Sequence, residues 1–238
     1  MAVYEIAGVR FKLTVTDPFT QQYIDAYRVD GEDAPETMVI TQEDIAFERT
    51  IQPNASIGLL TCCAVCRNLS RMLLYRYDGM LVHSAAMLYE GKAYLFVAPS
   101  GTGKTTHVML WKKCMGDKMA ILNGDKPFLR RNGDEITVYG SPWQGKEDYG
   151  MNASAPLGGV IFVNRDVENS VRHATVPEAL QRLALATVLP EDAEGRSKVL
   201  DFVDHICKTV PVGMLYCNME DEAVYTAKSF IDENKKQS

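Results

Sequence analysis

The residues of this sequence best suited to chemistry form a glycine-rich loop, Ala98 to Thr105, with the sequence APSGTGKT. It follows the apolar run YLFV and precedes the helix-like segment THVMLW. Gly101 and Gly103 allow backbone amides to turn toward the phosphates of a nucleotide, and the following helix presents its positive end there. Lys104 supplies a positive charge, and the Thr105 hydroxyl can bind magnesium. The pattern predicts a phosphate-binding loop.

The usual pattern begins with glycine, whereas this loop begins with Ala98, and the physical argument survives that change. The alternative is a glycine turn that joins a strand to a helix and binds nothing. On the nucleotide interpretation, the residues that bind ATP are Ser100, Gly101, Thr102, Gly103, Lys104, Thr105 and Thr106.

Asp125 is the candidate carboxylate on the magnesium side of the site. It follows the predicted strand MAILN, and its distance from Thr105 in the chain suits one helix plus one adjacent strand. A carboxylate at a strand end can bind magnesium and can accept the proton of an attacking hydroxyl. The alternative is an ordinary turn residue in NGDK.

The stretch GSPWQGKE, residues 140–147, offers two further charged candidates. Lys146 can neutralise charge on the transferred phosphoryl group, and Glu147 can complete a metal shell or position an acceptor hydroxyl. The alternative is a loop with an anchoring tryptophan.

Other polar residues near these motifs have open roles. His107 lies on the first turn of the predicted helix, where it could approach the nucleotide or face solvent. Asn152 could add a polar contact. Arg165 ends a predicted strand and could bind phosphate, although an exposed arginine is the commoner outcome.

Two regions are predicted to position these residues, with a boundary at residues 77/78. Residues 1–77 read as a small lobe of short extended pieces, up to about residue 55, followed by a helix over about 56–77. Residues 78–238 mix strands and helices around the glycine-rich loop. A single strand is expected over MLVHSAAMLYEG, and Asn132-Gly133 predicts a hairpin. The fold class is therefore predicted to be α/β with a mixed sheet, and residues 233–238 are expected to fray.

Composition narrows the class of protein. The 238 residues carry a net charge of −6, which argues against general nucleic-acid binding. We expect no membrane association, because no continuous apolar run of spanning length is present. The N-terminus MAVYEIAGVRFKL does not resemble a signal peptide, so we expect a reducing, cytoplasmic location with the six cysteines mostly free. The cluster TCCAVC predicts buried packing rather than a metal site, because no second Cys/His pair has zinc-ligand spacing.

The strings LVHSAAM, APSGTGKTTH, ILNGDKP and GSPWQGKE together resemble the HPr kinase-like branch of the family that includes ATP-dependent phosphoenolpyruvate carboxykinase. The resemblance covers about residues 78–165. It implies a carboxykinase-like P-loop core in which ATP and magnesium lie among His83, Ser100 to Thr105 and Asp125. His83, which by itself reads as a structural histidine, then becomes a phosphate-side or metal-side contact.

The chain departs from this family in one position of the site and in its length. The family carries adjacent aspartates where this chain has Gly124 and Asp125, so one carboxylate must serve as metal ligand, as base, or as both. At 238 residues, the chain is also too short to contain the phosphoenolpyruvate-binding elements of the full-size carboxykinases, so we do not expect it to catalyse decarboxylation.

The resemblance implies an ATP- and magnesium-dependent kinase acting on a hydroxyl, that of serine in a small protein or peptide, or that of a small hydroxy compound. Relatives that modify ribosomally made peptides make a peptide acceptor a plausible variant, and the hexamers of HPr kinases make a homo-oligomer possible. Two alternatives stay open: a nucleotide-binding regulator or adaptor without useful transfer, and a simple ATPase or GTPase.

Overall fold

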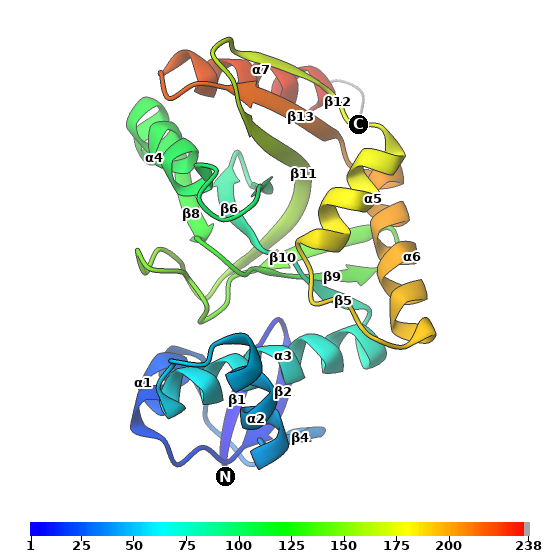
Figure 1. The fold of residues 1–238 in the computed structure, drawn as a ribbon. Coiled ribbons are helices and arrows are strands. Elements are labelled where there is room, and N and C mark those ends of the chain that lie inside the picture. Colours follow the sequence, from blue (N-terminus) through cyan, green and yellow to red (C-terminus); the bar gives the residue numbers. More distant parts are fainter. Residues whose placement is uncertain (236–238) are drawn as a thin grey trace.

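The computed structural model describes residues 1–235, which form an α/β fold with two sheets (Figure 1). The predicted class, α/β with a mixed sheet, is confirmed. Part of the expected frayed tail, residues 233–235, instead ends helix α7 (Glu222–Lys235), and residues 236–238 lie outside the described residues.

The smaller sheet belongs to the N-terminal part of the chain. Its strands are β1 (Ala2–Ile6), β2 (Val9–Leu13), β3 (Arg28–Val29) and β4 (Glu36–Met38), in the order β3-β1-β2-β4. Alternate residues of β2, namely Val9, Phe11 and Leu13, are buried. This period of two places one face of the sheet on a core.

Helices also form in this part of the chain, where the sequence indicated extended pieces. Helix α1 (Pro18–Ile24) begins with a proline in its first turn and is capped by Asp17, which accepts a hydrogen bond from the Thr20 amide. Helix α2 (Gln42–Ile51) begins with a reciprocal capping box between Thr41 and Asp44. Such caps satisfy amides that the first turn leaves free. The predicted extended pieces are confirmed by β1 to β4, whereas α1 and α2 were missed, because the prediction relied on apolar periodicity and overlooked the caps.

Helix α3 (Ile57–Arg76) confirms the helix expected before the boundary. It is long and apolar enough to cross a membrane by length and composition, but 56% of that apolar window is buried inside the fold, as in the core helix of a globular protein. Its residues Val65, Leu69 and Leu73 pack in one cluster with Phe11 of β2 and Phe128 of the larger sheet. A single apolar core therefore crosses the predicted boundary at residues 77/78.

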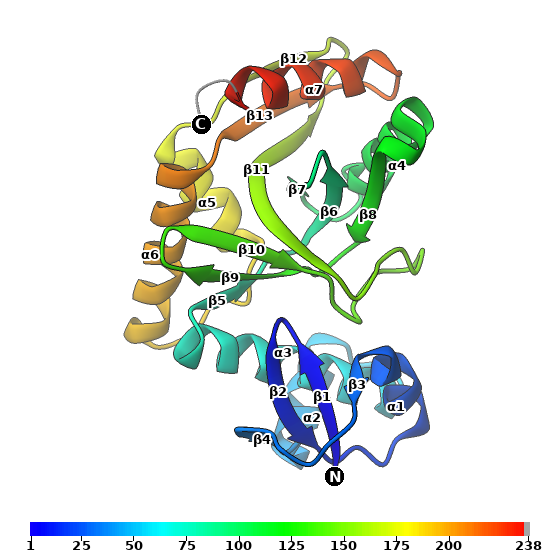
Figure 2. The same cartoon turned by 180° about the vertical axis from the view of Figure 1, so that it is seen from behind.

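The larger sheet is mixed and strongly curved around the long strand β11 (Figures 1 and 2). Its order is β5-β9-β10-β11-β7-β6-β8, with β13 on β11 and β12 on β13. The strands are β5 (Gly79–Leu81), β6 (Ser84–Tyr89), β7 (Lys92–Val97), β8 (Met119–Asn123), β9 (Phe128–Asn132), β10 (Glu135–Tyr139), β11 (Ser154–Arg165), β12 (Ser170–His173) and β13 (Val212–Cys217). The start of β11 pairs with β10, and its later residues pair in parallel with β7 and β13. The β9–β10 hairpin was predicted, whereas β12 was not.

Helices cover both faces of the central strands. On one face, α4 (Lys104–Met115) and α7 pack on Phe96 of β7 and Ile161 of β11. On the other face, α5 (Val176–Leu185) and α6 (Ala193–Thr209) pack on Leu95 and Phe162. Burial of both faces explains why these strands are apolar runs without alternation.

The six cysteines are free thiols, as predicted. Cys62 and Cys66 are buried in α3, and burial raises the pKa of each to about 12. A neutral buried thiol behaves as a small apolar side chain. Buried packing, the role predicted for this cluster, is confirmed for Cys62 and Cys66, whereas Cys63 is half-buried.

His107 of α4 does not face solvent, and its ring packs toward the sheet. It is buried, its Nε2 accepts a hydrogen bond from Trp111 Nε1 at 3.1 Å, and its ring lies 4.9 Å from that of Phe96. Burial lowers its pKa from 6.5 to about 4. The helix period places residue 107 toward the sheet, because it lies one turn before the buried Trp111.

The buried His107 makes stability depend on pH. Above pH 6.5 the ring is neutral in the folded and unfolded chains, and between pH 6.5 and about 4 the unfolded chain binds a proton that the folded chain excludes. Stability from this group is therefore complete above pH 6.5 and falls, by about 3 kcal/mol, as the pH drops through that window. Urea unfolding at several pH values should show this slope, and His107→Leu should flatten it. An unchanged slope in the variant would contradict the assignment.

Candidate functional site

The order of three strands brings the predicted chemical residues to one edge of the larger sheet. Strands β7 and β8 flank β6, and both are antiparallel to it, so their carboxyl ends lie at the same edge. The first residue of β6, Ser84, is opposite Val97, the last residue of β7. The glycine-rich loop after β7, the turn after β8 and the segment before β6 therefore meet.

This strand order corrects two expectations. Asp125 was expected after a strand adjacent to β7, yet β6 lies between β7 and β8. The single strand expected over residues 80–91 is divided at Val82 and His83, since β5 pairs with β9 while β6 pairs with β7 and β8. An uninterrupted apolar run gives no sign of such a change of partner. The break places His83 outside the sheet, where its side chain can reach Asp125.

The glycine-rich loop (residues 98–103) is braced by Arg165 at the end of β11. The guanidinium of Arg165 donates to the carbonyl oxygens of Gly101 at 2.6 Å and Thr102 at 2.9 Å. The N–H and C=O of one peptide unit point in opposite directions, so the amide of Gly103 points away from Arg165. Gly101 and Gly103 have φ values of 77° and 115°, which only glycine adopts readily. Arg165 is exposed, which is the commoner outcome expected from sequence, and its guanidinium also braces the loop.

Lys104 begins α4 and is buried against the loop. Its Nζ donates to the carbonyl oxygen of Ala98 at 2.7 Å. Burial lowers the pKa of this ammonium group, and the negative charge of Asp125 opposes that shift. The first turn of α4 contains no acidic residue. The positive end of the helix and the lysine charge are therefore not neutralised within that turn.

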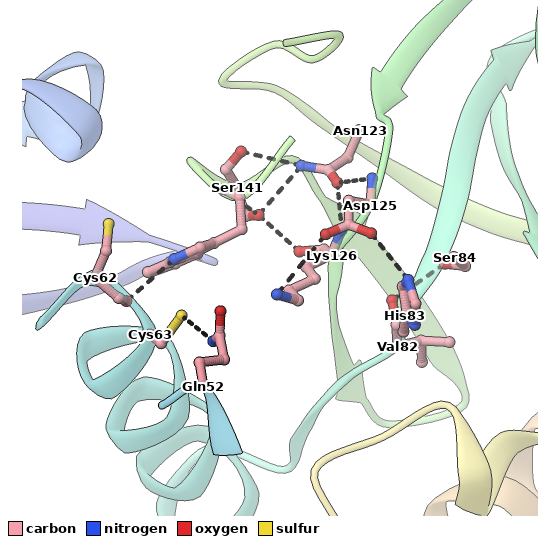
Figure 3. Close-up of polar contacts among 11 residues, drawn as sticks. Gln52, Cys62, Cys63, Val82, His83, Ser84, Asn123, Asp125, Lys126 and Ser141 are labelled. Carbon is pink, nitrogen blue, oxygen red and sulfur yellow. Dashed lines mark hydrogen bonds and ion pairs between the residues drawn. The ribbon is translucent and has the colours of Figure 1, made fainter. Parts of the chain in front are cut away.

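Asp125 and His83 form the central polar pair of this edge (Figure 3). His83 Nε2 lies 2.9 Å from Asp125 Oδ1, and Lys126 Nζ lies 3.7 Å from Asp125 Oδ2. Burial would raise the pKa of Asp125, but the hydrogen bond from His83 and the charges of Lys126, His83 and Lys104 together lower it below its usual value. The carboxylate is therefore anionic at neutral pH.

The turn that carries Asp125 is held by Asn123, which sequence reasoning missed. Asn123 is fully buried, and its Oδ1 accepts hydrogen bonds from the amides of Asp125 at 2.9 Å and Lys126 at 2.7 Å. Its Nδ2 donates to the carbonyl oxygen and hydroxyl of Ser141, and the Ser141 hydroxyl donates to the Lys126 carbonyl oxygen (Figure 3). The signal was the asparagine in NGDK, which typically bonds to amides two residues on.

Gly124 occupies a position with no room for a side chain. A Cβ at Gly124 would lie 2.6 Å from the carbonyl oxygen of Gln144, and one at Gly145 would lie 3.2 Å from the Cβ of Asp125. The loop over residues 143–149 therefore lies directly against Asp125. This close approach explains physically why the chain has glycine beside Asp125 rather than a second aspartate.

The structure places Lys146 and Glu147 on the exposed turn that follows Gly145, next in the chain to the contact with Asp125. Neither side chain makes an ion pair or hydrogen bond that the structure records within residues 1–235. Trp143 of the same loop is buried and donates from Nε1 to the Cys62 carbonyl oxygen at 3.2 Å. Asn152 is not brought to the site, because it donates to the carbonyl oxygen of Ala26.

Within residues 1–235, no group of three or more His, Cys, Asp or Glu side chains is placed to hold a metal ion. Magnesium bound with a nucleotide needs fewer protein ligands, since it keeps waters and takes one or two carboxylates together with phosphate oxygens. The Thr105 hydroxyl in the first turn of α4 and the anionic Asp125 fit that chemistry. The donor set is therefore suited to magnesium with phosphate and unsuited to an all-protein metal site.

No protein-family model matches the chain, and no curated protein matches it in sequence. Among solved structures, it is similar to the structure of the Hpr(Ser) kinase/phosphatase from Coxiella burnetii, with a TM-score of 0.37 and 7% sequence identity. The match covers 66% of this chain and 97% of that chain. The similarity is a distant one of fold.

Removal of the Asn123 amide should destabilise the protein and release the turn that carries Asp125. We expect Asn123→Ala to lower the free energy of unfolding by about 2–4 kcal/mol, because several buried polar groups lose their partners. Urea unfolding at pH 7 measures the effect. Asn54→Ala, which alters an exposed residue, is the matched control and should change stability by less than about 0.5 kcal/mol. Equal effects of the two substitutions would exclude the bracing role.

Proposed function

We propose that this protein is an ATP- and magnesium-dependent kinase that transfers the γ-phosphoryl group to a hydroxyl, that of serine in a small protein or peptide or that of a small hydroxy compound. The observation that carries the proposal is the anionic Asp125, paired with His83 at the sheet edge that also holds the glycine-rich loop. The resemblance of the motifs around His83, Lys104 and Asp125 to those of HPr kinase-like proteins supports the same reaction.

On this proposal the glycine-rich loop and the start of α4 hold the triphosphate. Backbone amides of the loop donate to phosphate oxygens, with Gly103 oriented by the Arg165 brace. Lys104 leaves the Ala98 carbonyl oxygen and pairs with the β and γ phosphates. Thr105 and Asp125 hold magnesium, which supplies charge neutralisation on those phosphates when bound.

Asp125 orients the acceptor hydroxyl as well. Its lowered pKa makes it a weak base but keeps it anionic, which suits a metal ligand that also accepts a hydrogen bond from the hydroxyl. The bond from the acceptor oxygen to phosphorus forms while the bond from phosphorus to the departing ADP oxygen breaks, and the hydroxyl proton passes to the carboxylate. In such a reaction positioning and charge stabilisation supply most of the acceleration.

We assign Lys146 and Glu147 supporting roles in this reaction because of where they lie. They lie on the exposed turn whose Gly145 contacts Asp125. Lys146 is assigned to charge relief on the transferred phosphoryl group, and Glu147 to positioning of the acceptor. Both assignments use side chains that are free to turn toward a bound substrate.

The second candidate function is a nucleotide-binding regulator or adaptor. The observation that favours it is the tight contact of Gly124 with the Gln144 carbonyl oxygen, which leaves Asp125 as the single carboxylate of this turn. On this alternative the protein binds ATP but transfers no phosphate.

Transfer of labelled γ-phosphate from ATP to serine peptides and to small hydroxy compounds, with and without magnesium, tests the proposal. We expect chelation of magnesium to abolish transfer, and Asp125→Asn to lower kcat about 100-fold or more, because a neutral amide binds magnesium more weakly than a carboxylate and does not accept the proton. Nucleotide binding, measured by calorimetry, should be lost in Lys104→Ala.

Asp117→Asn is the matched control, because Asp117 is an exposed carboxylate on the turn after α4, and it should leave transfer unchanged. Transfer by Asp125→Asn at the wild-type rate would refute the kinase mechanism. ATP binding by the wild-type protein without acceptor-dependent release of ADP would support the adaptor instead.

A further inference from the structure

A cavity of about 800 Å³ lies between the N-terminal helices α2 and α3 and the segment 186–192 that joins α5 to α6. Its volume is within the range of roughly 300–1,000 Å³ found for ligand sites. From its lining we infer that this cleft binds the phosphate acceptor, as a peptide segment that carries basic and apolar side chains beside its serine. The inference rests on the proposed kinase function and adds the acceptor's chemistry to it.

The cleft reaches the proposed site through Lys126. This side chain lines the cavity, and its Nζ lies 3.7 Å from Asp125 Oδ2. Figure 3 shows Lys126 between Asp125 on one side and Gln52 and Cys63, two other lining residues, on the other. Lys126 therefore lies between an acceptor in the cleft and Asp125, the carboxylate that would accept the proton of the acceptor's hydroxyl.

The wall of the cleft formed by segment 186–192 is hydrogen-bonded to the residue that pairs with Asp125. The amide of His83 donates to the carbonyl oxygen of Ala186 at 2.6 Å, at the start of segment 186–192. Residues 188–192 of that segment line the cavity. One backbone contact thus links the histidine partner of Asp125 to the wall that would hold the acceptor.

The charges that line the cleft favour a basic partner. Two of the lining cations already have an acidic partner: Arg67 forms an ion pair with the buried Glu48, and Lys126 lies beside Asp125. The third lining cation, Arg71, is outnumbered by the remaining lining carboxylates, which are Glu43, Asp44, Glu191 and Asp192.

These carboxylates are available as charges. Burial would raise the pKa of Asp44, but hydrogen bonds from the Thr41 amide and hydroxyl lower it on balance. Glu43 and Glu191 form no ion pair that the structure records within residues 1–235. The rim is therefore negative at neutral pH, which attracts a cationic partner and repels an acidic one.

Apolar side chains are exposed along the same rim. Phe47, Ile51 and Leu189 are 42%, 59% and 51% exposed. The guanidinium of Arg67 lies 3.9 Å from the centroid of the Phe47 ring, which fixes that ring at the cleft. A peptide with aliphatic and basic side chains would match this rim. Its aliphatic side chains would cover the exposed apolar residues, and its basic side chains would pair with the carboxylates. The exposed rim also leaves room for a peptide to extend beyond the cavity.

The test uses two short synthetic peptides, each with a central serine, one flanked by Lys, Arg and Leu and the other with Glu in place of every Lys and Arg. Their binding to the full-length protein is measured by fluorescence anisotropy, which requires no transfer. We expect the basic peptide to bind more tightly than the acidic one. We expect Glu43→Lys/Glu191→Lys to weaken the basic peptide about tenfold or more and to raise its KM in the transfer assay by a similar factor, because like charges then face each other.

The control is Asp117→Lys/Glu168→Lys, which makes the same change of net charge at exposed positions outside the cleft. It should leave peptide binding and KM unchanged, and both double variants should bind ATP as the wild-type protein does, which reports on folding. The inference is overturned if the two peptides bind equally, or if the cleft variant and the control weaken binding to the same extent.

Different results would refute the kinase proposal and the acceptor inference. Charge-dependent binding of the basic peptide without phosphate transfer supports the cleft as a peptide site and counts against the kinase. Phosphorylation of a small hydroxy compound or of the acidic peptide, insensitive to Glu43→Lys/Glu191→Lys, supports the kinase and overturns the acceptor inference.

Discussion

The hydrogen bonds of the buried Asn123 side chain hold the candidate site together. Through Ser141 they fasten the turn after β8 to the loop over residues 140–149, and through the amides of Asp125 and Lys126 they set the direction of two charged side chains. Each buried polar group left without a hydrogen-bond partner would lower the free energy of unfolding by about 1–3 kcal/mol. The geometry of the site therefore depends on a residue that takes no part in the proposed chemistry.

The same turn explains why Asp125 has no acidic neighbour at position 124 of the candidate site. Gly124 leaves no space for a neighbouring acid, because the Gln144 backbone lies against it. His83 compensates in part, since its hydrogen bond, together with nearby positive charges, keeps Asp125 ionised despite burial. The candidate site thus has a closely packed glycine where a second acid could stand, and Asp125 is the anion of this turn.

The N-terminal part of the chain contacts the candidate site and also contributes to the core. Trp143, in the loop that lies against Asp125, is packed edge-on against Phe128 and donates a hydrogen bond to α3. Lys126 extends from the Asp125 turn toward α2 and α3. Any movement of these helices relative to the larger sheet would alter the surroundings of Asp125, because the inferred acceptor cleft and the proposed catalytic residue are in contact through Lys126.

By itself the sequence determined the α/β class, the strand, glycine-rich loop and helix around Lys104, the helix α3 and the free cysteines, because local spacing and apolar periodicity carry that information. The capped helix α2 was also readable from Thr41 and Asp44 but was overlooked. Only the tertiary structure decided that β6 separates β7 from β8, that His83 meets Asp125, and that His107 and Arg165 serve packing and bracing. These outcomes depend on strand pairing and on contacts between residues far apart in the chain, which local patterns do not specify.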